Sequence, residues 1–597
     1  MRATGPAVEP KIPLVRLQQG SITGKVEKAG EAFSWESECD MKMRFKVLLS
    51  LLLLLTVPAV VQAQFTFTTN DDNTLTITAY TGSGGDVTIP DTTNGYPVTS
   101  IGNSAFLNMS VTSITIPDSI TNIGDGAFEN CYGLTSVTIP SSVTSVGTNA
   151  FYVCTGLTNV NIGDGITSFG GWMFYGCTGL ATVSLGTNVV SIGSYTFEGC
   201  SSLTSITIPN SVTNIGTGAF LICSKLNNIT IPNGSIGDNA FQNCSSLTNA
   251  IIGSGVTGIG SSAFQDCAKL TTVTIGANVL SIGSSAFQNC SSLASITIPN
   301  NVTNIGSYAF QNCSSLPFIT IPGNVTNIGS SAFQSCTKLN SITIANGSIA
   351  VSEFAGCFSL ASVTIPDSVT SIGNSAFETC LSLTNVTVGD GVLNIGLMAF
   401  GSCSHLISVT IGNGVTNIGT SAFQDCGKLT NVTMGNGVGT IGQNAFDTCS
   451  SLVSITIPKS VTNILDNAFF DCTGLNAVYF AGNAPAASSL AFSYALKVIV
   501  YYLPGTTGWT STFKGRPALL WNPQVPTGDG SFGVLNDQFG FHITGTTNIP
   551  ILVEGSTNLA GASWSPLQAC TLTNGLIYFS DPDWTNYPGR FYRIRSR

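Results

Sequence analysis

The sequence predicts a β-rich solenoid of about 17 coils of 23 residues, with an N-terminal hairpin cap and a small all-β C-terminal module. Three observations predict it. A repeat recurs at nearly constant length, apolar and polar residues alternate inside each repeat, and a proline or glycine stands where the alternation stops. One repeat of this size cannot bury its own apolar face, whereas stacked repeats share a continuous core.

The repeat is marked by a phenylalanine that usually follows an alanine. Residues 286–313, for example, begin and end with AFQNC. Seventeen such phenylalanines define 16 intervals, of which 13 are 23 residues long, one is 22 and two are 21. The two shortest units lose residues in a turn, which leaves the strand intact. The markers are Phe106, Phe128, Phe151, Phe174, Phe197, Phe220, Phe241, Phe264, Phe287, Phe310, Phe333, Phe354, Phe377, Phe400, Phe423, Phe446 and Phe469.

Each unit contains one predicted strand and one predicted corner. In a typical unit, Val137 and Ile139 face one way along an extended segment and Thr138 faces the other. Pro140 has no N–H to donate to a continuing ladder, so the strand ends there. Gly147 stands at a corner where a Cβ would be unfavourable. The alternation therefore predicts a half-buried strand that is followed by a turn in every coil.

The recurring motif LxxIxIPxxVTxIGxxAFxxC resembles that of the BspA-type leucine-rich repeat proteins. The resemblance covers residues 98–480 and is matched many times in the same register. It implies a leucine-rich repeat solenoid on a secreted or surface protein. It also implies adhesion or ligand binding to host or matrix components, without catalysis.

Residues 41–63 have a basic start, an apolar centre and a small-residue end at Ala63, which is typical of a secretory signal peptide. The apolar centre is shorter than the roughly 20 residues of a membrane span. We expect residues 1–40 to be an over-extended gene start, with translation beginning at Met41 or Met43. The mature chain, cleaved near Ala63, would have no membrane span and would be secreted or held on the outer cell surface. A signal anchor is the alternative.

The rest of the chain divides into an N-terminal cap at 64–97, the repeats at 98–480, a C-terminal cap at 481–522, a linker at 523–530 and a module at 531–597. The module alternates apolar and polar residues and resembles the C-terminal tails of many exported proteins of environmental Gram-negative bacteria. The resemblance implies a role in sorting or surface attachment. Carbohydrate binding by Trp564, Trp584 and Tyr587 is the alternative, although aromatic residues in so small a module more often form its core.

Composition excludes several classes of function. A net charge of −10 argues against a nucleic-acid partner, which requires a basic surface. The chain has two histidines, His405 and His542, and the sequence places no second catalytic group near either. Single aspartates at strand ends are explained as turn formers, and no zinc or EF-hand spacing is present. We therefore expect no enzyme activity, no cofactor and no metal.

Sixteen of the 18 cysteines stand three residues after a marker phenylalanine, from Cys131 to Cys472. An exported protein with regularly spaced cysteines suggests disulfides. Three points favour a buried thiol ladder instead. Side chains in a ladder point in parallel, Met109 fills the slot in the first unit, and removal of the signal peptide leaves an odd number, 17.

The outward slot at the centre of each strand is threonine in most coils, which predicts a flat, uncharged, hydrogen-bonding column. We interpret the column as a candidate ligand face for a surface glycan or an extracellular protein of unknown identity. Three alternatives remain: strand propensity and solubility alone, a passive surface-layer element, and ice binding by the regular threonines. The candidate residues are Thr138, Asn161, Ser184, Thr207, Thr230, Thr274, Thr297, Thr320, Thr343, Thr364, Thr387, Thr410, Thr433 and Thr456.

Overall fold

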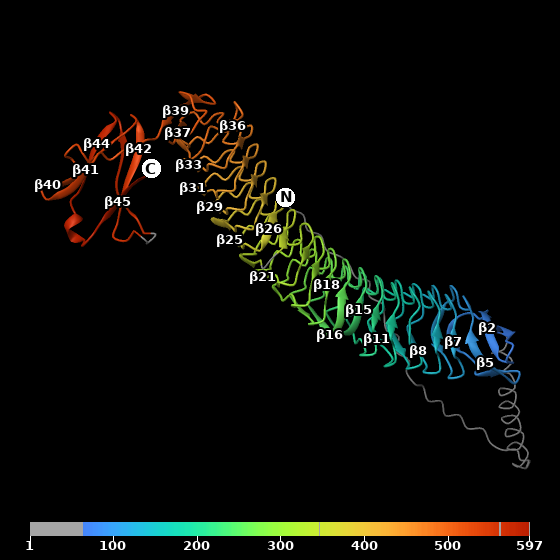
Figure 1. The fold of residues 1–597 in the computed structure, drawn as a ribbon. Helices are drawn as coiled ribbons and strands as arrows, with labels where there is room; N and C mark the ends of the chain where they lie inside the picture. Colours follow the sequence, from blue (N-terminus) through green and yellow to red (C-terminus); the bar gives the residue numbers. More distant parts are fainter. Residues whose placement is uncertain (1–63, 345–346, 560–562, 596–597) are drawn as a thin grey trace, which may run out of the picture. The chain divides into compact units, whose positions relative to one another are not determined.

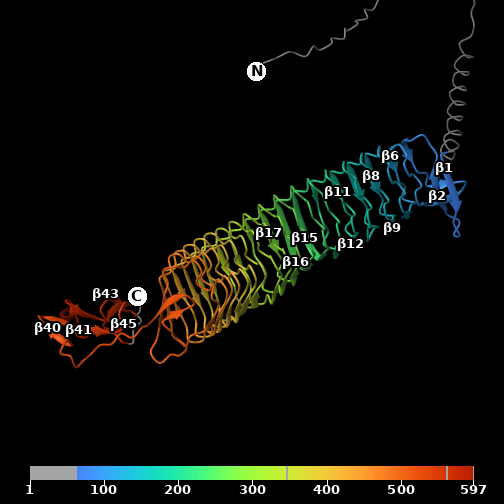
Figure 2. The ribbon, with the colours of Figure 1, turned by 90° about the horizontal axis from the view of Figure 1, so that it is seen from above.

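The computed structural model describes residues 64–344, 347–559 and 563–595. The predicted signal peptide at 41–63 and the predicted over-extended start at 1–40 lie outside the described residues. The predicted solenoid is confirmed: the chain winds into about 19 stacked coils (Figures 1 and 2). Within the described residues there is no α-helix, and one short 3-10 helix, η1 (Trp584–Asn586), lies in the C-terminal module.

One side of the stack, the strand face, carries one strand from each coil. Within each sheet of this series adjacent strands pair in parallel, so that Thr387 lies between Thr364 and Thr410. The strands are β3 (Gly85–Thr88), β6 (Val111–Thr115), β8 (Ser136–Ile139), β10 (Asn159–Ile162), β11 (Thr182–Ser184), β13 (Ser205–Ile206), β15 (Asn228–Ile236), β16 (Asn249–Ile259), β17 (Thr272–Ile275), β19 (Ser295–Ile296), β21 (Phe318–Thr320), β23 (Ser341–Thr343), β25 (Ser362–Ile365), β27 (Asn385–Val388), β29 (Ser408–Ile411), β31 (Asn431–Thr433), β33 (Ser454–Ile457), β35 (Ala477–Phe480), β37 (Ile499–Tyr502) and β39 (Arg516–Leu520).

A second side carries shorter parallel strands, and β15 and β16 are long enough to belong to both sides. The second series comprises β5 (Tyr96–Ile101), β7 (Asn122–Ile123), β9 (Ser145–Val146), β12 (Ser191–Ile192), β14 (Asn214–Ile215), β18 (Ser281–Ile282), β20 (Asn304–Ile305), β22 (Asn327–Ile328), β24 (Gly347–Ile349), β26 (Val369–Ile372), β28 (Asn394–Ile395), β30 (Asn417–Ile418), β32 (Thr440–Ile441), β34 (Asn463–Ile464) and β36 (Ala486–Ala487).

The third side, the turn side, is made of consecutive tight turns around the marker phenylalanine. Its backbone groups also bond between coils: the Phe128 N–H donates to the Ala150 carbonyl of the next coil at 2.8 Å. On the second side the direction reverses, and the Gly147 N–H donates to the Ile123 carbonyl of the preceding coil at 2.8 Å. Each coil is thus hydrogen-bonded to both of its neighbours.

The marker phenylalanines form a continuous buried column, with adjacent ring centroids 4.8–5.5 Å apart. Tyr80 stacks on Phe106 at 5.1 Å, and Phe492 stacks on Phe469 at 5.4 Å. The column therefore gains one ring at each end, which accounts for 19 coils where the sequence count gives 17. The Ala491-Phe492 pair repeats the marker, but the cysteine that accompanies it elsewhere is missing.

The predicted thiol ladder is confirmed, because the sixteen repeat cysteines are free and buried. Each thiol donates to the carbonyl of the marker phenylalanine in the preceding coil, at sulfur–oxygen distances of 3.0–3.4 Å; Cys154 to Phe128 and Cys313 to Phe287 are examples. The cysteine therefore fills a small core slot and also bonds one coil to the coil before it.

The corner glycine is required by the close approach of two coils. At Gly147 an added Cβ would lie 2.5 Å from the backbone nitrogen of Asp125, and at Gly283 it would lie 2.5 Å from the carbonyl carbon of Gly260. Neither glycine needs a left-handed backbone. The close packing of successive corners therefore explains why the sequence has glycine at these positions.

One coil buries an acidic side chain, because Glu353 occupies the slot that holds alanine in the adjacent coils. Its side chain is 1% exposed, as buried as Ala332 and Ala376 in the same slot. The Ala350 N–H donates to its carboxyl group at 2.7 Å. Burial raises the pKa of Glu353 to about 8, against the opposing effect of that hydrogen bond.

The two ends of the stack differ. At the N-terminus β1 (Phe65–Thr69) pairs antiparallel with β2 (Leu75–Tyr80), which in turn pairs with β5, and β4 (Thr92–Thr93) forms a small hairpin with β5. These strands cover the open end of the core, where an exposed edge would invite aggregation. At the other end β38 (Thr512–Phe513) forms a hairpin with β39.

The C-terminal module consists of two three-stranded antiparallel sheets, and its core continues into the last coils. Tyr479 and Tyr501 of the strand face share one apolar cluster with Phe541 and Ile549 of the module. The Trp521 indole N–H also donates to the Pro550 carbonyl at 3.0 Å. The first sheet contains β40 (Gly533–Leu535), β41 (Gln538–Thr544) and β44 (Leu576–Asp581); the second contains β42 (Ile549–Ser556), β43 (Ser565–Leu572) and β45 (Phe591–Arg595).

The thiol ladder gives the first testable prediction. In purified residues 64–597 a thiol reagent is expected to modify at most Cys570 under native conditions, and all 17 cysteines in guanidinium chloride. Burial raises the thiol pKa values, that of Cys336 to about 12, so reactive thiolate is scarce until the coils separate. Cys570→Ser should abolish the native reaction. Fewer than 17 reactive thiols in denaturant without reductant would show that the ladder is disulfide-bonded.

Glu353 gives a prediction of pH dependence. The folded-state pKa of about 8 lies above the ordinary value of 4.5, so the folded state binds more protons between these limits. Stability is therefore lost as pH rises through that window, by at most about 1.4 kcal/mol per pH unit. Glu353→Ala should melt higher than the wild type at pH 8, and the difference should shrink toward pH 5. Glu378→Gln, which changes a half-buried carboxylate in the next coil, is the control. Parallel melting profiles for wild type and Glu353→Ala would contradict the assignment.

Candidate ligand-binding face

The structure places all 14 predicted residues in exposed outward positions on the strand face. They form a column, here named the threonine column, because parallel pairing sets equivalent residues side by side. Thr138 lies beside Asn161, and Asn161 lies beside Ser184. Farther along, Thr387 lies between Thr364 and Thr410. Neighbouring parallel strands lie about 4.8 Å apart, so the column is a regular row of polar side chains.

The threonine column differs from its neighbours in how its polar groups are used. Within the described residues, none of its 14 side chains makes a hydrogen bond to another protein group. The threonines three positions earlier are engaged: the Thr158 hydroxyl donates to the Thr135 carbonyl at 2.9 Å. The residues two positions before the threonine column lie between these two rows, and some of them are engaged as well. The Thr182 hydroxyl, for example, donates to Asn159 Oδ1 at 2.8 Å. The threonine column is therefore the part of the face whose donors and acceptors remain available.

Two hollows on this face are each lined by two adjacent members of the threonine column. The first, of about 540 Å³, is lined by predicted residues Ser184 and Thr207 together with Leu185, Thr187 and Pro209. The second, of about 380 Å³, contains predicted residues Thr433 and Thr456 and lies farther along the column. Asn431, Asn436, Ser454 and Arg595 also line the second hollow. Near each end of the column, two adjacent members thus border a concave surface.

Apolar residues interrupt and end the column. Ile251 takes the slot between Thr230 and Thr274 and is 40% exposed. In the two strands after Thr456, the equivalent position is occupied by Tyr479 and then by Tyr501. These tyrosines pack against the C-terminal module. The change from threonine to Tyr479 is visible in the sequence, but the surface that covers it is apparent only in the structure.

The aromatic residues proposed as an alternative carbohydrate site in the module are engaged by other groups. The Arg593 guanidinium lies over the Trp564 ring at 4.4 Å, and that of Arg590 lies over the Tyr587 ring at 4.3 Å. The Trp584 indole N–H donates to the Asp537 carbonyl at 3.0 Å. Each of these three side chains therefore contributes a contact to the structure of the module itself.

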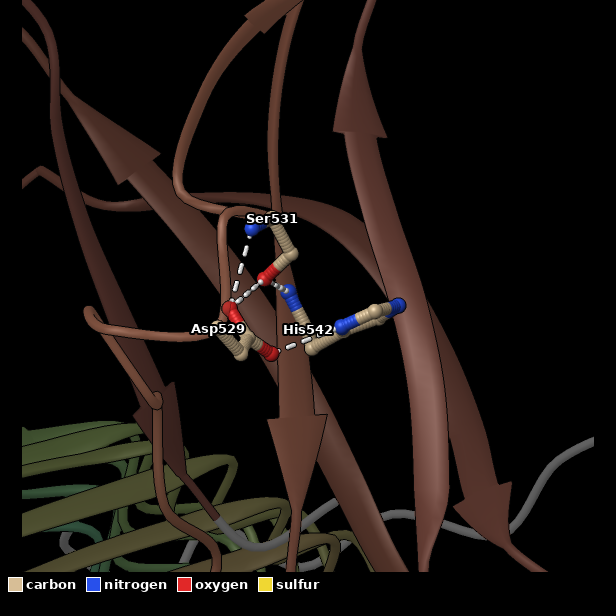
Figure 3. Close-up of polar contacts among 3 residues, drawn as sticks. All are labelled: Asp529, Ser531 and His542. Carbon is tan, nitrogen blue, oxygen red and sulfur yellow. Dashed lines mark hydrogen bonds and ion pairs between the residues drawn. The ribbon is translucent and has the colours of Figure 1, made fainter.

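The structure brings Asp529 and Ser531 to His542, a grouping that the sequence spacing did not predict (Figure 3). Asp529 Oδ2 lies 2.8 Å from His542 Nδ1, and Asp529 Oδ1 accepts from the Ser531 hydroxyl at 2.6 Å. The His542 backbone N–H donates to the Ser531 hydroxyl at 2.9 Å. A catalytic Ser-His-Asp relay needs the imidazole between hydroxyl and carboxylate. Here the carboxylate lies between the other two groups, so the cluster fastens the segment that leads into β40 to strand β41.

Within the described residues, no group of three or more His, Cys, Asp or Glu side chains is arranged to hold a metal ion. The same residues form no helix that is long and apolar enough to cross a membrane. His405 contacts Ser404, with 3.3 Å between Nδ1 and the hydroxyl oxygen.

Taken together, the fold and the face define a class: a parallel solenoid protein with a repeated core and a repeated polar surface. Comparison with protein families matches the "BspA type Leucine rich repeat region (6 copies)" over residues 99–227, 154–271, 234–353 and 347–476. The chain belongs to the BspA-type leucine-rich repeat family. No curated protein matches the chain.

The chain is also similar to several solved structures. A leucine-rich repeat protein from Bacteroides ovatus is 24% identical, with 74% of this chain and 94% of that chain covered and a TM-score of 0.44. A leucine rich cell surface protein from Faecalibacterium prausnitzii is 27% identical, with coverages of 74% and 93% and a TM-score of 0.24. The leucine rich repeat protein of T. pallidum is 26% identical, with coverages of 35% and 88% and a TM-score of 0.26.

The Asp529 cluster gives a testable prediction. Hydrogen bonds from the Ser531 hydroxyl and N–H, and then His542, lower the pKa of Asp529 to about 2. Ser531→Ala should raise this pKa toward the ordinary value of 3.8, as measured by carboxyl NMR titration of residues 64–597. Because the folded pKa is depressed, the stabilisation is present above the ordinary pKa and is lost as pH falls toward 2. Ser580→Ala in β44 is the control, and an unchanged Asp529 pKa in Ser531→Ala would refute the arrangement.

Proposed function

We propose that this protein is an exported, non-enzymatic leucine-rich repeat protein that binds a glycan or protein partner at the cell surface. The contact surface is the strand face. The observation that carries the proposal is the threonine column: 14 exposed side chains in a repeated row, with no hydrogen-bond partner among the described residues. Membership of the BspA-type family is consistent with adhesion or binding in general.

The chemistry of the column suits a neutral, hydroxyl-rich ligand. Each Ser or Thr hydroxyl offers one donor and two acceptor positions, and an Asn amide offers both kinds of group. The column contains no charged residue, so an uncharged polymer can approach without removing an ion from water. An extended glycan would meet equivalent groups in successive coils. The hollows at Ser184 and Thr207, and at Thr433 and Thr456, are the concave places where a ligand would be held most closely.

The location rests on the sequence. The pattern at 41–63 directs the chain out of the cytoplasm, with cleavage near Ala63. The module at 531–597 then serves in sorting or surface attachment, at the end of the solenoid where the threonine column gives way to Tyr479.

A passive structural element is the second candidate. The similarity of the coils favours it, because recognition of one specific ligand normally varies the outward residues from coil to coil. Along the slot of the threonine column, Asn161, Ser184 and Ile251 are the departures from threonine before Tyr479, and all lie N-terminal to Thr274. We therefore propose that a specific site, if the face has one, lies in the N-terminal coils, beside the hollow at Ser184.

The test measures binding of purified residues 64–597 to a panel of polysaccharides and extracellular-matrix proteins. Replacing Thr297, Thr320 and Thr364 with valine removes three column hydroxyls but keeps β-branched side chains of the same shape. Saturable binding should weaken at least tenfold, because each lost hydrogen bond contributes about 0.5–1.5 kcal/mol. The matched control replaces Thr303, Thr326 and Thr370 with valine on the second side of the stack.

The other outcomes discriminate the alternatives. Binding that is equally strong in the column variant and the control variant would refute the strand face as the contact surface. Absence of saturable binding to the whole panel would favour the passive element. A second pair of variants, Ser184→Ala with Thr207→Val and Thr433→Val with Thr456→Val, then shows which hollow holds the ligand.

A further inference from the structure

The turn side of the coils carries a local departure from the repeat that the threonine column does not explain. Two positions in each coil, two residues before and two after the marker phenylalanine, have a left-handed backbone. Most coils place Ser, Asn, Asp or Gly there, which tolerate this conformation best. Around four consecutive markers, from Phe151 to Phe220, one slot in each coil holds a larger residue: Val153 (φ 55°), Trp172 (φ 56°), Tyr195 (φ 59°) and Ile222 (φ 61°). Tyr308 and Met398 are isolated examples in later coils.

The coils from Phe151 to Phe197 also display stacked aromatic rings. Trp172 is 42% exposed and stacks on Tyr195, with ring centroids 5.5 Å apart and planes 13° apart. Tyr152 stacks on Tyr175 at 4.8 Å and 6°. One coil contributes to both pairs, because Trp172 and Tyr175 belong to the same turn, where the Tyr175 N–H donates to the Trp172 carbonyl at 3.1 Å. Four aromatic side chains of consecutive coils thus lie on the turn side as two stacked pairs.

Carboxylates flank the Tyr152–Tyr175 pair in the same column of the turn side. The position that follows the marker phenylalanine reads Glu129, Tyr152, Tyr175 and Glu198 in successive coils. Burial raises the pKa of Glu198, and the proximity of Glu198 raises the pKa of the Tyr175 phenol. The same column in later coils holds glutamines that bond to one another, as Gln242 does to Gln265 at 3.1 Å. We name the six residues Glu129, Tyr152, Trp172, Tyr175, Tyr195 and Glu198 the aromatic strip.

The charge around the strip has one sign. From Gln64 to Ser224 the sequence contains no Lys, Arg or His, and the first cation after this stretch is Lys225. The same 161 residues contain nine carboxylates: Asp71, Asp72, Asp86, Asp91, Asp118, Asp125, Glu129, Asp164 and Glu198. Within the described residues, Glu129 and Glu198 accordingly have no ion-pair partner. The coils of this stretch therefore carry carboxylates and no cationic side chain, and a charge of one sign attracts cations and repels acidic ligands.

We propose that the aromatic strip is a second interaction surface, which binds a protein segment rich in arginine or lysine. Guanidinium and ammonium groups donate to carboxylates and phenol oxygens, while their carbon stems pack on aromatic rings. Tyrosine and tryptophan are also the residues that most often anchor protein contacts. The carboxylates favour a basic segment over a neutral sugar, which carries no charge to complement Glu129 and Glu198. This surface lies on the turn side and is independent of ligand binding at the strand face.

The test uses purified residues 64–597 and an octa-arginine peptide, with an octapeptide of glycine and serine as the neutral probe. Binding is measured by calorimetry at two salt concentrations. Saturable binding of octa-arginine, weakened by salt, is expected. Trp172→Ser combined with Tyr195→Ser places serine in slots where Ser262 and Ser285 already adopt the same backbone. Glu129→Gln combined with Glu198→Gln likewise introduces the residue that later coils use. Neither change should disturb folding, and each should weaken binding at least tenfold.

Two matched controls separate the strip from general electrostatics. Tyr308→Ser makes the same change in a distant coil and should leave affinity within twofold. Asp71→Asn combined with Asp118→Asn removes the same charge as the double glutamine variant, but elsewhere on the N-terminal coils, and should also stay within twofold. A loss in the Asp variant equal to that in the Glu variant would overturn the proposal in favour of diffuse attraction. Unchanged binding in the Trp172 and Tyr195 variant, or no saturable binding of octa-arginine, would overturn it as well.

Discussion

Every coil depends on its two neighbours for hydrogen bonds, and this dependence governs the rest of the molecule. On the second side Gly147 donates backward to Ile123, and on the turn side Phe128 donates forward to Ala150. A coil that slipped by one residue would lose both sets of bonds and turn its apolar residues outward. The exact recurrence of Phe, Cys and Gly follows from this. The phenylalanine rings stack, the thiols reach the previous carbonyl, and the corner glycines allow the close approach.

This constraint explains why so much of the fold could be predicted from the sequence. A repeat whose apolar residues alternate and stop at Pro140 specifies a strand, a turn and a shared core, with no need to know distant contacts. The thiol state was also predictable, because Met109 shows that the cysteine slot needs bulk and does not need a partner sulfur. The count of coils was low by two. At one end Tyr80 replaces the marker, and at the other Phe492 lacks its cysteine.

What the sequence could not supply depends on contacts between units or on backbone conformation. The threonine column was located by alternation, but the difference between its unengaged hydroxyls and those of Thr135 or Thr158 needs coordinates. The contact of Tyr479 and Tyr501 with the module, and the approach of Asp529 to His542, arise from tertiary folding of a segment with no repeat. The left-handed positions of Trp172 and Tyr195 were hidden because their slots look like ordinary turn residues.

The cysteine ladder has a consequence for how the chain must be made. A thiol is shielded only after its own coil has docked, and in a partly wound chain the cysteines of undocked coils remain open to oxidant. In an oxidising compartment, winding and disulfide formation therefore compete for the same sulfur atoms. The contacts of each coil are with adjacent coils, so winding can proceed quickly from one end to the other. The sixteen thiols therefore stay reduced in such a compartment if winding is faster than oxidation, and the final stability of the stack matters less.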